Sequence, residues 1–124
     1  AQTAAAFALR HAEAASRRMS EAYRRRRDLV MELLGEIPDL RVSRPDGAFY
    51  DFFDVSAYFG AGKNGLQIAN STEFANYLLD EAGVSTVAGA GFGDERCIRI
   101  STAASEDMLR EGIGRIAKAM AALR

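Results

Sequence analysis

The sequence has 124 residues, is 48% hydrophobic and 27% charged, and carries a formal net charge of −1. This composition is typical of one globular domain and excludes a disordered tail, a collagen-like repeat and a disulfide scaffold. Near neutrality argues against nucleic acid as the main partner, and no apolar run reaches the roughly 20 residues of a membrane span. The opening residues show no signal-peptide pattern and the single Cys97 suits a reducing compartment, so we expect a cytoplasmic location.

Residues 2–34 predict one long helix, or two helices in line, because they contain neither Gly nor Pro and begin with an Ala-rich run. A straight helix of that length would run about 50 Å, whereas a compact domain of this size is about 35 Å across. We therefore expect a bend near Ser16 and Ser20, and a first half that packs on protein outside this chain. The start at Ala1, without an initiator Met, also suggests a segment of a larger protein.

The remainder mixes short strands with two further helices. Strands are expected near residues 40–43, 48–55, 84–87 and 96–101, loops over 56–70 and 89–93, and helices over 71–82 and 105–123. Asn70 and Ser105 are the expected helix caps. The final helix has one apolar stripe, formed by Leu109, Ile113, Ile116, Met120 and Leu123. The predicted fold class is α+β, with a small, mostly antiparallel sheet that carries packed helices and follows the long helix.

The run Arg24-Arg25-Arg26-Arg27 is the most basic stretch of the sequence. Consecutive helical residues turn by about 100°, so the four side chains point nearly all round the helix instead of lining one face. We expect solvated side chains and ion pairs here. A nucleic-acid binder is the remote alternative.

The segment Gly60-Ala61-Gly62-Lys63-Asn64-Gly65 matches the pattern G-x-G-x-x-G. A dinucleotide site needs this pattern directly between a strand and a helix, and here loop residues lie on both sides. We interpret it as a surface loop.

The sequence offers few groups for acid–base, nucleophilic or metal chemistry. His11 is the only histidine and Cys97 the only cysteine, too few ligands for a metal site. Asp51 and Asp54 are three positions apart on a predicted strand. An odd spacing places them on opposite faces, so they form no acid–base pair. We expect no metal site.

Arg99 is a charged residue between two isoleucines of a predicted strand. Alternation places it, with Cys97 and Ser101, on the face opposite Ile98 and Ile100. Two readings are equally supported by the residues themselves. Arg99 forms an ion pair with an acid such as Asp94, Glu95 or one from a helix, or it is preformed to bind the carboxylate of a ligand.

Five segments, taken together and in this order, resemble the C-terminal part of the class I/II pyridoxal-phosphate aminotransferases, of the aspartate-aminotransferase type. The segments are residues 23–29 (YRRRRDL), 45–50 (PDGAFY), 74–84 (FANYLLDEAGV), 89–93 (GAGFG) and 97–101 (CIRIS), followed by Ala103 and Ser105. The resemblance spans essentially the whole chain.

The resemblance implies that residues 1–34 are a long helix linking to a missing large domain and that residues 35–124 are the small domain. It also implies that Arg99 binds the α-carboxylate of an amino-acid or 2-oxo-acid substrate. The implied full-length protein is a homodimer that transfers amino groups with pyridoxal 5′-phosphate as cofactor.

The family's cofactor-binding lysine, its aspartate partner and its phosphate-binding groups lie in the large domain. The two lysines of this sequence, Lys63 and Lys118, are not in the family's sequence context, and the family's usual proline before the glycine-rich turn is Ala88. We therefore expect no catalytic and no cofactor-binding residue here, and an inactive chain when alone. The alternative to the enzyme is a non-enzymatic α+β ligand-binding or regulatory module.

Overall fold

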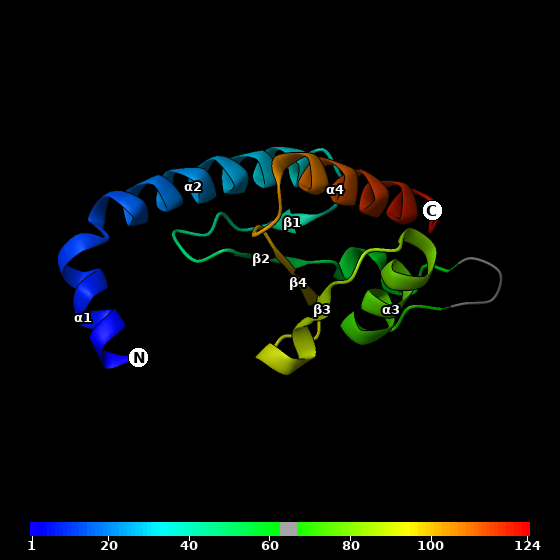
Figure 1. The fold of residues 1–124 in the computed structure, drawn as a ribbon. Coiled ribbons are helices and arrows are strands. Elements are labelled where there is room, and N and C mark those ends of the chain that lie inside the picture. The colour runs from blue at the N-terminus through cyan, green and yellow to red at the C-terminus, as the bar shows by residue number, and fades with distance from the viewer. Residues whose placement is uncertain (63–66) are drawn as a thin grey trace.

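The computed structural model describes residues 1–62 and 67–124, which form an α+β fold (Figure 1). One antiparallel sheet has the strand order β1-β2-β4-β3. Its strands are β1 (Arg41–Val42), β2 (Tyr50–Asp54), β3 (Val87–Ala88) and β4 (Cys97–Ser101). The α-helices are α1 (Gln2–His11), α2 (Glu13–Gly35), α3 (Ser71–Ala82) and α4 (Glu106–Ala121). The predicted fold class and the mainly antiparallel sheet are confirmed.

A single hydrophobic core joins α2, α3 and α4 to one face of the sheet. Phe53 of β2 and Ile98 of β4 are almost completely buried there. The predicted apolar stripe of the last helix is also buried, and it consists of Leu109, Ile113, Ile116, Met120 and Leu123. Side chains alternate along a strand, so the residues next to Phe53 in β2 and next to Ile98 in β4 belong to the opposite face of the sheet.

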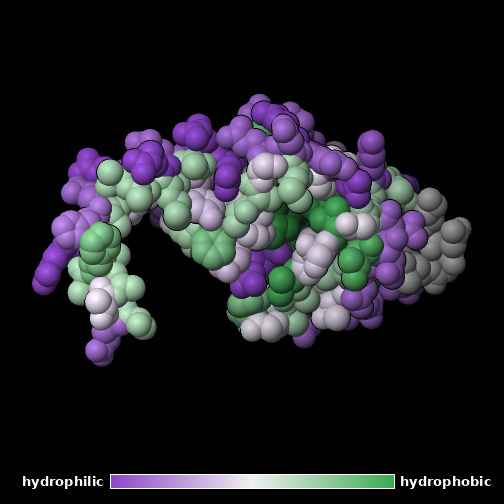
Figure 2. All heavy atoms as spheres, viewed as in Figure 1, coloured by the Kyte–Doolittle hydropathy of each residue, from purple (hydrophilic) through white to green (hydrophobic). Residues whose placement is uncertain are grey.

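The N-terminal helical segment breaks at Ala12, where φ −97° and ψ 9° leave the helical region between α1 and α2. The bend expected near Ser16 and Ser20 is wrong, because both serines lie within α2, and the two helices are not in line (Figure 1). No residue of α1 is buried, and Figure 2 shows the helix standing away from the rest of the molecule. Because α1 buries no residue against the rest of the described chain, no packing keeps it in line with α2.

All four strands are shorter than predicted, and the differences are largest for β2 and β3. β2 begins at Tyr50 instead of residue 48, because Ala48 has a φ of 64° and cannot be part of an extended strand. The strand expected over 84–87 is shorter and lies later in the chain, at Val87–Ala88. Val84 instead donates its backbone N–H to the carbonyl of Leu78 at 3.2 Å, and so closes the end of α3.

The predicted helix caps are confirmed. The side-chain oxygen of Asn70 accepts hydrogen bonds from the backbone N–H groups of Thr72 and Glu73, each at 3.0 Å. Ser105 Oγ accepts one from Met108 at 3.3 Å. Both loops contain a short 3₁₀ turn, η1 (Ser56–Tyr58) and η2 (Gly89–Phe92), which the sequence pattern did not predict. Within the described ranges, no helix combines the length and the apolar character that crossing a bilayer requires.

Candidate functional site

Arg99 lies in the middle of β4, the strand that is flanked by β2 on one side and β3 on the other. Its cross-strand neighbours are Phe52 and Val87. Ile98 and Ile100 are buried, whereas Arg99 is partly exposed, so the predicted alternation of β4 is confirmed at these three positions. The guanidinium therefore lies on the face of the sheet that the core does not cover.

Two aromatic rings contact the guanidinium. The ring centroids of Tyr50 and Phe92 each lie 4.3 Å from Arg99 Cζ, within the range of cation–π attraction. Tyr50 comes from β2 and Phe92 from η2, which follows β3. The rings therefore approach from elements on opposite sides of β4.

The acids named as ion-pair partners of Arg99, Asp94 and Glu95, do not pair with it in the described part of the chain. Asp94 Oδ2 binds Arg96 Nη2 at 2.7 Å, and the hydrogen bonds from Arg96 lower the pKa of this carboxyl to about 2. Glu95 is exposed. Among the ion pairs of the described residues none involves Arg99, so the ion-pair reading finds no support there.

The η2 turn that carries Phe92 depends on Gly89. A Cβ atom at this position would lie 2.3 Å from the carbonyl oxygens of Asp94 and Cys97, so no side chain fits. The residue before it, Ala88, has a φ of −61°, close to the value that a proline ring imposes. Alanine in place of the proline implied by the resemblance therefore keeps a proline-like backbone here.

Asp51 is the second charged residue of interest, and it lies on the core face of β2, opposite Ile100. Its exposed fraction is 0%, and neither carboxylate oxygen has a hydrogen-bond partner among the residues that the structure describes. Burial raises the pKa of this carboxyl to about 6, against the opposing charge of Arg27. Asp54, by contrast, is partly exposed and accepts a hydrogen bond from the backbone N–H of Ser56 at 2.8 Å. The two acids therefore lie on opposite faces of β2, as predicted.

The remaining candidates have structural roles or none. Cys97 is buried, and desolvation raises the pKa of its thiol to about 11, which disfavours the nucleophilic thiolate. His11 is exposed on α1, with its ring 4.6 Å from that of Phe7. The described residues include no group of three or more metal-ligating side chains. Lys118 is exposed on α4, and Lys63 lies outside the described residues.

Two arginines of the run form ion pairs, as predicted. Arg27 binds Asp28 at 2.8 Å, Arg25 lies 3.9 Å from Glu106, and Arg26 lies over the ring of Tyr23. Figure 2 shows hydrophilic side chains along the surface of α2 and α4. In the glycine-rich segment, Gly60 donates its backbone N–H to Ile68, whereas residues 63–66 lie outside the described part.

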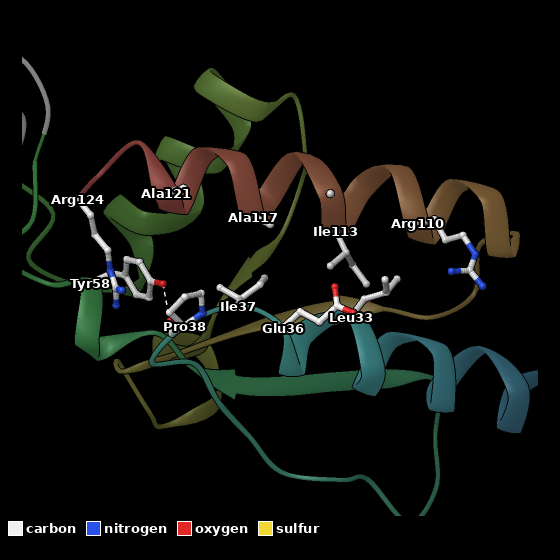
Figure 3. Close-up of a pocket in the computed structure, with 11 residues that line it drawn as sticks. Leu33, Glu36, Ile37, Pro38, Tyr58, Arg110, Ile113, Ala117, Ala121 and Arg124 are labelled. Carbon is white, nitrogen blue, oxygen red and sulfur yellow. Dashed lines mark hydrogen bonds between the residues drawn. The ribbon is translucent and has the colours of Figure 1, made fainter.

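A groove of about 330 Å³ lies between the end of α2 and helix α4 (Figure 3). Its apolar walls include Leu33, Ile37, Ile113 and Ala117. Arg124 at one end pairs with Asp39 and lies 4.8 Å from the ring centroid of Tyr58. Arg99 does not line this groove, which is therefore separate from the carboxylate site considered above.

Comparisons with known proteins agree with one another. A family model described as aminotransferase class I and II matches residues 1–116. The bifunctional aspartate aminotransferase and glutamate/aspartate-prephenate aminotransferase of Petunia hybrida is 44% identical over 107 residues, which cover 86% of this chain and 22% of that protein. The crystal structure of the aspartate aminotransferase from Rhizobium meliloti has a TM-score of 0.78 and 41% identity, covering 82% of this chain and 26% of that one.

An aromatic aminotransferase structure from Pyrococcus horikoshii is also similar, with a TM-score of 0.71 and 34% identity. The match covers 84% of this chain and 26% of that one. The chain thus spans about a quarter of the length of these relatives.

Proposed function

We propose a function from the premise that the chain belongs to the class I and II aminotransferases, a family that depends on pyridoxal phosphate. The chain is the small domain of such an enzyme, which transfers an amino group between an amino acid and a 2-oxo acid. Residues 1–34 link it to a large domain outside this chain, and residues 35–124 form the small domain itself. The whole enzyme is a homodimer.

Arg99 binds the α-carboxylate of the substrate. The observation that carries this role is a guanidinium on the open face of the sheet whose Cζ lies 4.3 Å from the centroids of two rings and which has no acid partner among the described residues. A guanidinium forms two parallel N–H hydrogen bonds with a carboxylate, a geometry that fixes the orientation of the substrate as well as its position. Such an orientation brings the α-carbon to one place relative to the reacting groups.

The described residues do not fit the cofactor. Their lysine, Lys118, is exposed on α4, whereas lysines that form imines are activated in desolvated or cationic pockets. We place the groups that hold pyridoxal phosphate in the large domain, as the resemblance implies, and we assign no chemical step to this chain. With pyridoxal phosphate added, the 124-residue chain is expected to show no imine absorbance and no transaminase turnover.

The amino donor is aspartate or another amino acid. Two of the relatives carry aspartate in their names and another is an aromatic aminotransferase, so related chains serve different donors. All of these donors share the α-carboxylate. The role proposed for Arg99 is accordingly independent of the donor's side chain.

The test is Arg99→Ala in the longer enzyme that contains this chain. Loss of a charged, bidentate contact is expected to raise KM and to lower kcat/KM by about 100-fold for every amino acid offered. Arg96→Ala is the matched control, because Arg96 precedes the same strand but pairs with Asp94. An Arg99→Ala enzyme with unchanged kcat/KM would show that the assignment is wrong.

A further inference from the structure

Two aromatic rings contact the guanidinium of Arg99, one from an element on each side of β4. Tyr50 and Phe92 are far apart in the sequence, yet both ring centroids lie 4.3 Å from Arg99 Cζ. We propose that Tyr50 and Phe92 are positioning residues, which hold this guanidinium in place while leaving its N–H groups free for the substrate carboxylate. This inference rests on the proposed function and deepens it.

The chemistry of the guanidinium explains why rings suit this task better than an acid. All five N–H donors of an arginine lie in the plane of the group, and its two flat faces carry none. A ring over a face stabilises the cation without using a donor. An acid of the chain would occupy the same N–H groups that a substrate carboxylate needs, and the two would compete. The nearby Arg96 shows this situation, because its Nε and Nη2 donate hydrogen bonds to the Asp94 carboxylate.

Each of the two contacting rings is supported by a further ring. Phe49 lies 4.3 Å from Tyr50 and 5.9 Å from Tyr23 of α2, measured between ring centroids. Phe52 lies 6.2 Å from Phe92, nearly edge to face at 74°. The five rings thus form two groups, Tyr23, Phe49 and Tyr50 in one and Phe52 and Phe92 in the other, and each group has one ring in contact with Arg99. Packing of one ring against the next limits the rotamers of the two that contact the arginine.

The exposure of these rings separates their role from that of core packing. Phe53 and Phe74 in the core are 1% and 0% exposed, whereas Tyr50 is 36% and Phe92 53% exposed. Rings that served only to bury apolar surface would gain little at such positions. Contact with the guanidinium of Arg99 gives these two exposed rings a role that core packing does not.

The activity test compares ring removal with ring replacement in the longer enzyme. Phe92→Leu and Tyr50→Leu are each expected to raise KM for the amino acid about threefold to tenfold, with kcat within about twofold of wild type. Phe92→Trp and Tyr50→Phe keep a ring and are expected to retain the wild-type KM. Leu79→Ala, which shortens an exposed apolar side chain of α3, is the control.

A KM rise with ring removal and its rescue by the conservative variants would support the inference. Unchanged KM in both leucine variants, or a fall in kcat alone, would overturn it. Arg99→Ala keeps the two hypotheses apart. If that variant raises KM and the leucine variants do not, the positioning role is wrong and the carboxylate role stands. If Arg99→Ala itself has no effect, both are wrong.

A second measurement needs no activity. In the 124-residue chain, ring currents are expected to shift the Arg99 side-chain δ protons upfield in the proton NMR spectrum. Phe92→Leu should move these signals toward their random-coil positions, while the signals of the core, such as the methyl groups of Ile98, stay unchanged. Random-coil positions of the Arg99 signals in a wild-type chain whose Ile98 methyl signals are shifted as in a folded core would contradict the arrangement.

Discussion

The two faces of the sheet each carry a charged residue without an ion-pair partner among the described residues, and they accommodate it in opposite ways. On the open face, Arg99 is partly exposed and contacts the rings of Tyr50 and Phe92. On the core face, Asp51 is completely buried and neither of its oxygens has a hydrogen-bond partner in the described part of the chain. The two residues lie on adjacent strands, one register position apart.

The difference shows what makes an unpaired charge useful. A partly exposed guanidinium next to two aromatic rings keeps contact with water and gains cation–π attraction, so it can stay without an acid partner at little cost. A buried carboxylate without donors loses the energy of its solvation and gains nothing in return. The arginine is thus a candidate site, whereas the aspartate is a source of instability within the same sheet.

The largest expected effect is a loss of stability when Gly89, in the turn that carries Phe92, is replaced. Gly89→Ala places a methyl group against two backbone carbonyls, and we expect it to destabilise the chain by about 3 kcal/mol or more. The η2 turn would have to shift, and with it the ring of Phe92. Urea unfolding measures the loss of stability.

Gly91→Ala in the same turn is the matched control. A Cβ atom at Gly91 has no neighbour within 4 Å, so its cost is expected to stay below about 1 kcal/mol. Equal effects of the two substitutions would show that the turn does not approach the backbone as closely as described.

The next effect comes from removing the charge of the core face. Asp51→Leu replaces a buried carboxylate by an apolar side chain, and we expect it to stabilise the chain by about 2 kcal/mol at pH 7. The physical reason is that the wild-type chain must bury an ionised group at this pH. Lower stability of the leucine variant at pH 7 would mean that Asp51 has a partner in solution.

The destabilising effect of Asp51 also predicts how the free energy of unfolding depends on pH. The pKa of Asp51 rises from 3.8 to about 6 on folding, so the folded chain binds this proton more tightly than the unfolded chain. The free energy of unfolding is therefore expected to fall as the pH rises from about 4 to about 6, and then to level off. The leucine variant should lack this fall. Asp94, whose pKa is lowered to about 2, acts in the opposite direction and at more acidic pH.

Much of the body of the fold could be predicted from local patterns. The stripe of the last helix, the caps at Asn70 and Ser105 and the central strand are confirmed, because each depends on residues within a few positions of one another. The break at Ala12 could not be predicted, because no glycine or proline marks it and no residue of α1 is buried against the rest of the described chain. The strand expected at 84–87 was misplaced because closure of α3 uses the backbone of Val84.

The candidate site was predictable at its centre and not at its periphery. Alternation alone placed Arg99 opposite the two isoleucines, but the rings that contact it depend on the strand order β2-β4-β3, which no local pattern encodes. Asp51 was missed for a related reason. Aromatic residues occupy both faces of its strand, so the pattern separates Asp51 from Asp54 without indicating which of the two points inward.

The smallest effect on stability, and the sharpest test of the comparison, comes from giving Arg99 an acid of its own. Val87 lies directly across from Arg99 in the sheet and is 43% exposed. Val87→Glu is expected to change the free energy of unfolding by less than about 1 kcal/mol, because exposed ion pairs contribute little.

The same substitution is expected to raise KM in the longer enzyme about twofold to fivefold at low salt, since the new carboxylate competes with that of the substrate. Added salt should reduce the effect by screening the new pair. Val87→Gln, which has the same shape without the charge, should leave KM near the wild-type value. If Glu and Gln act alike, the N–H groups of Arg99 are not the part of the molecule that the substrate meets, and the contrast between the two faces loses its functional meaning.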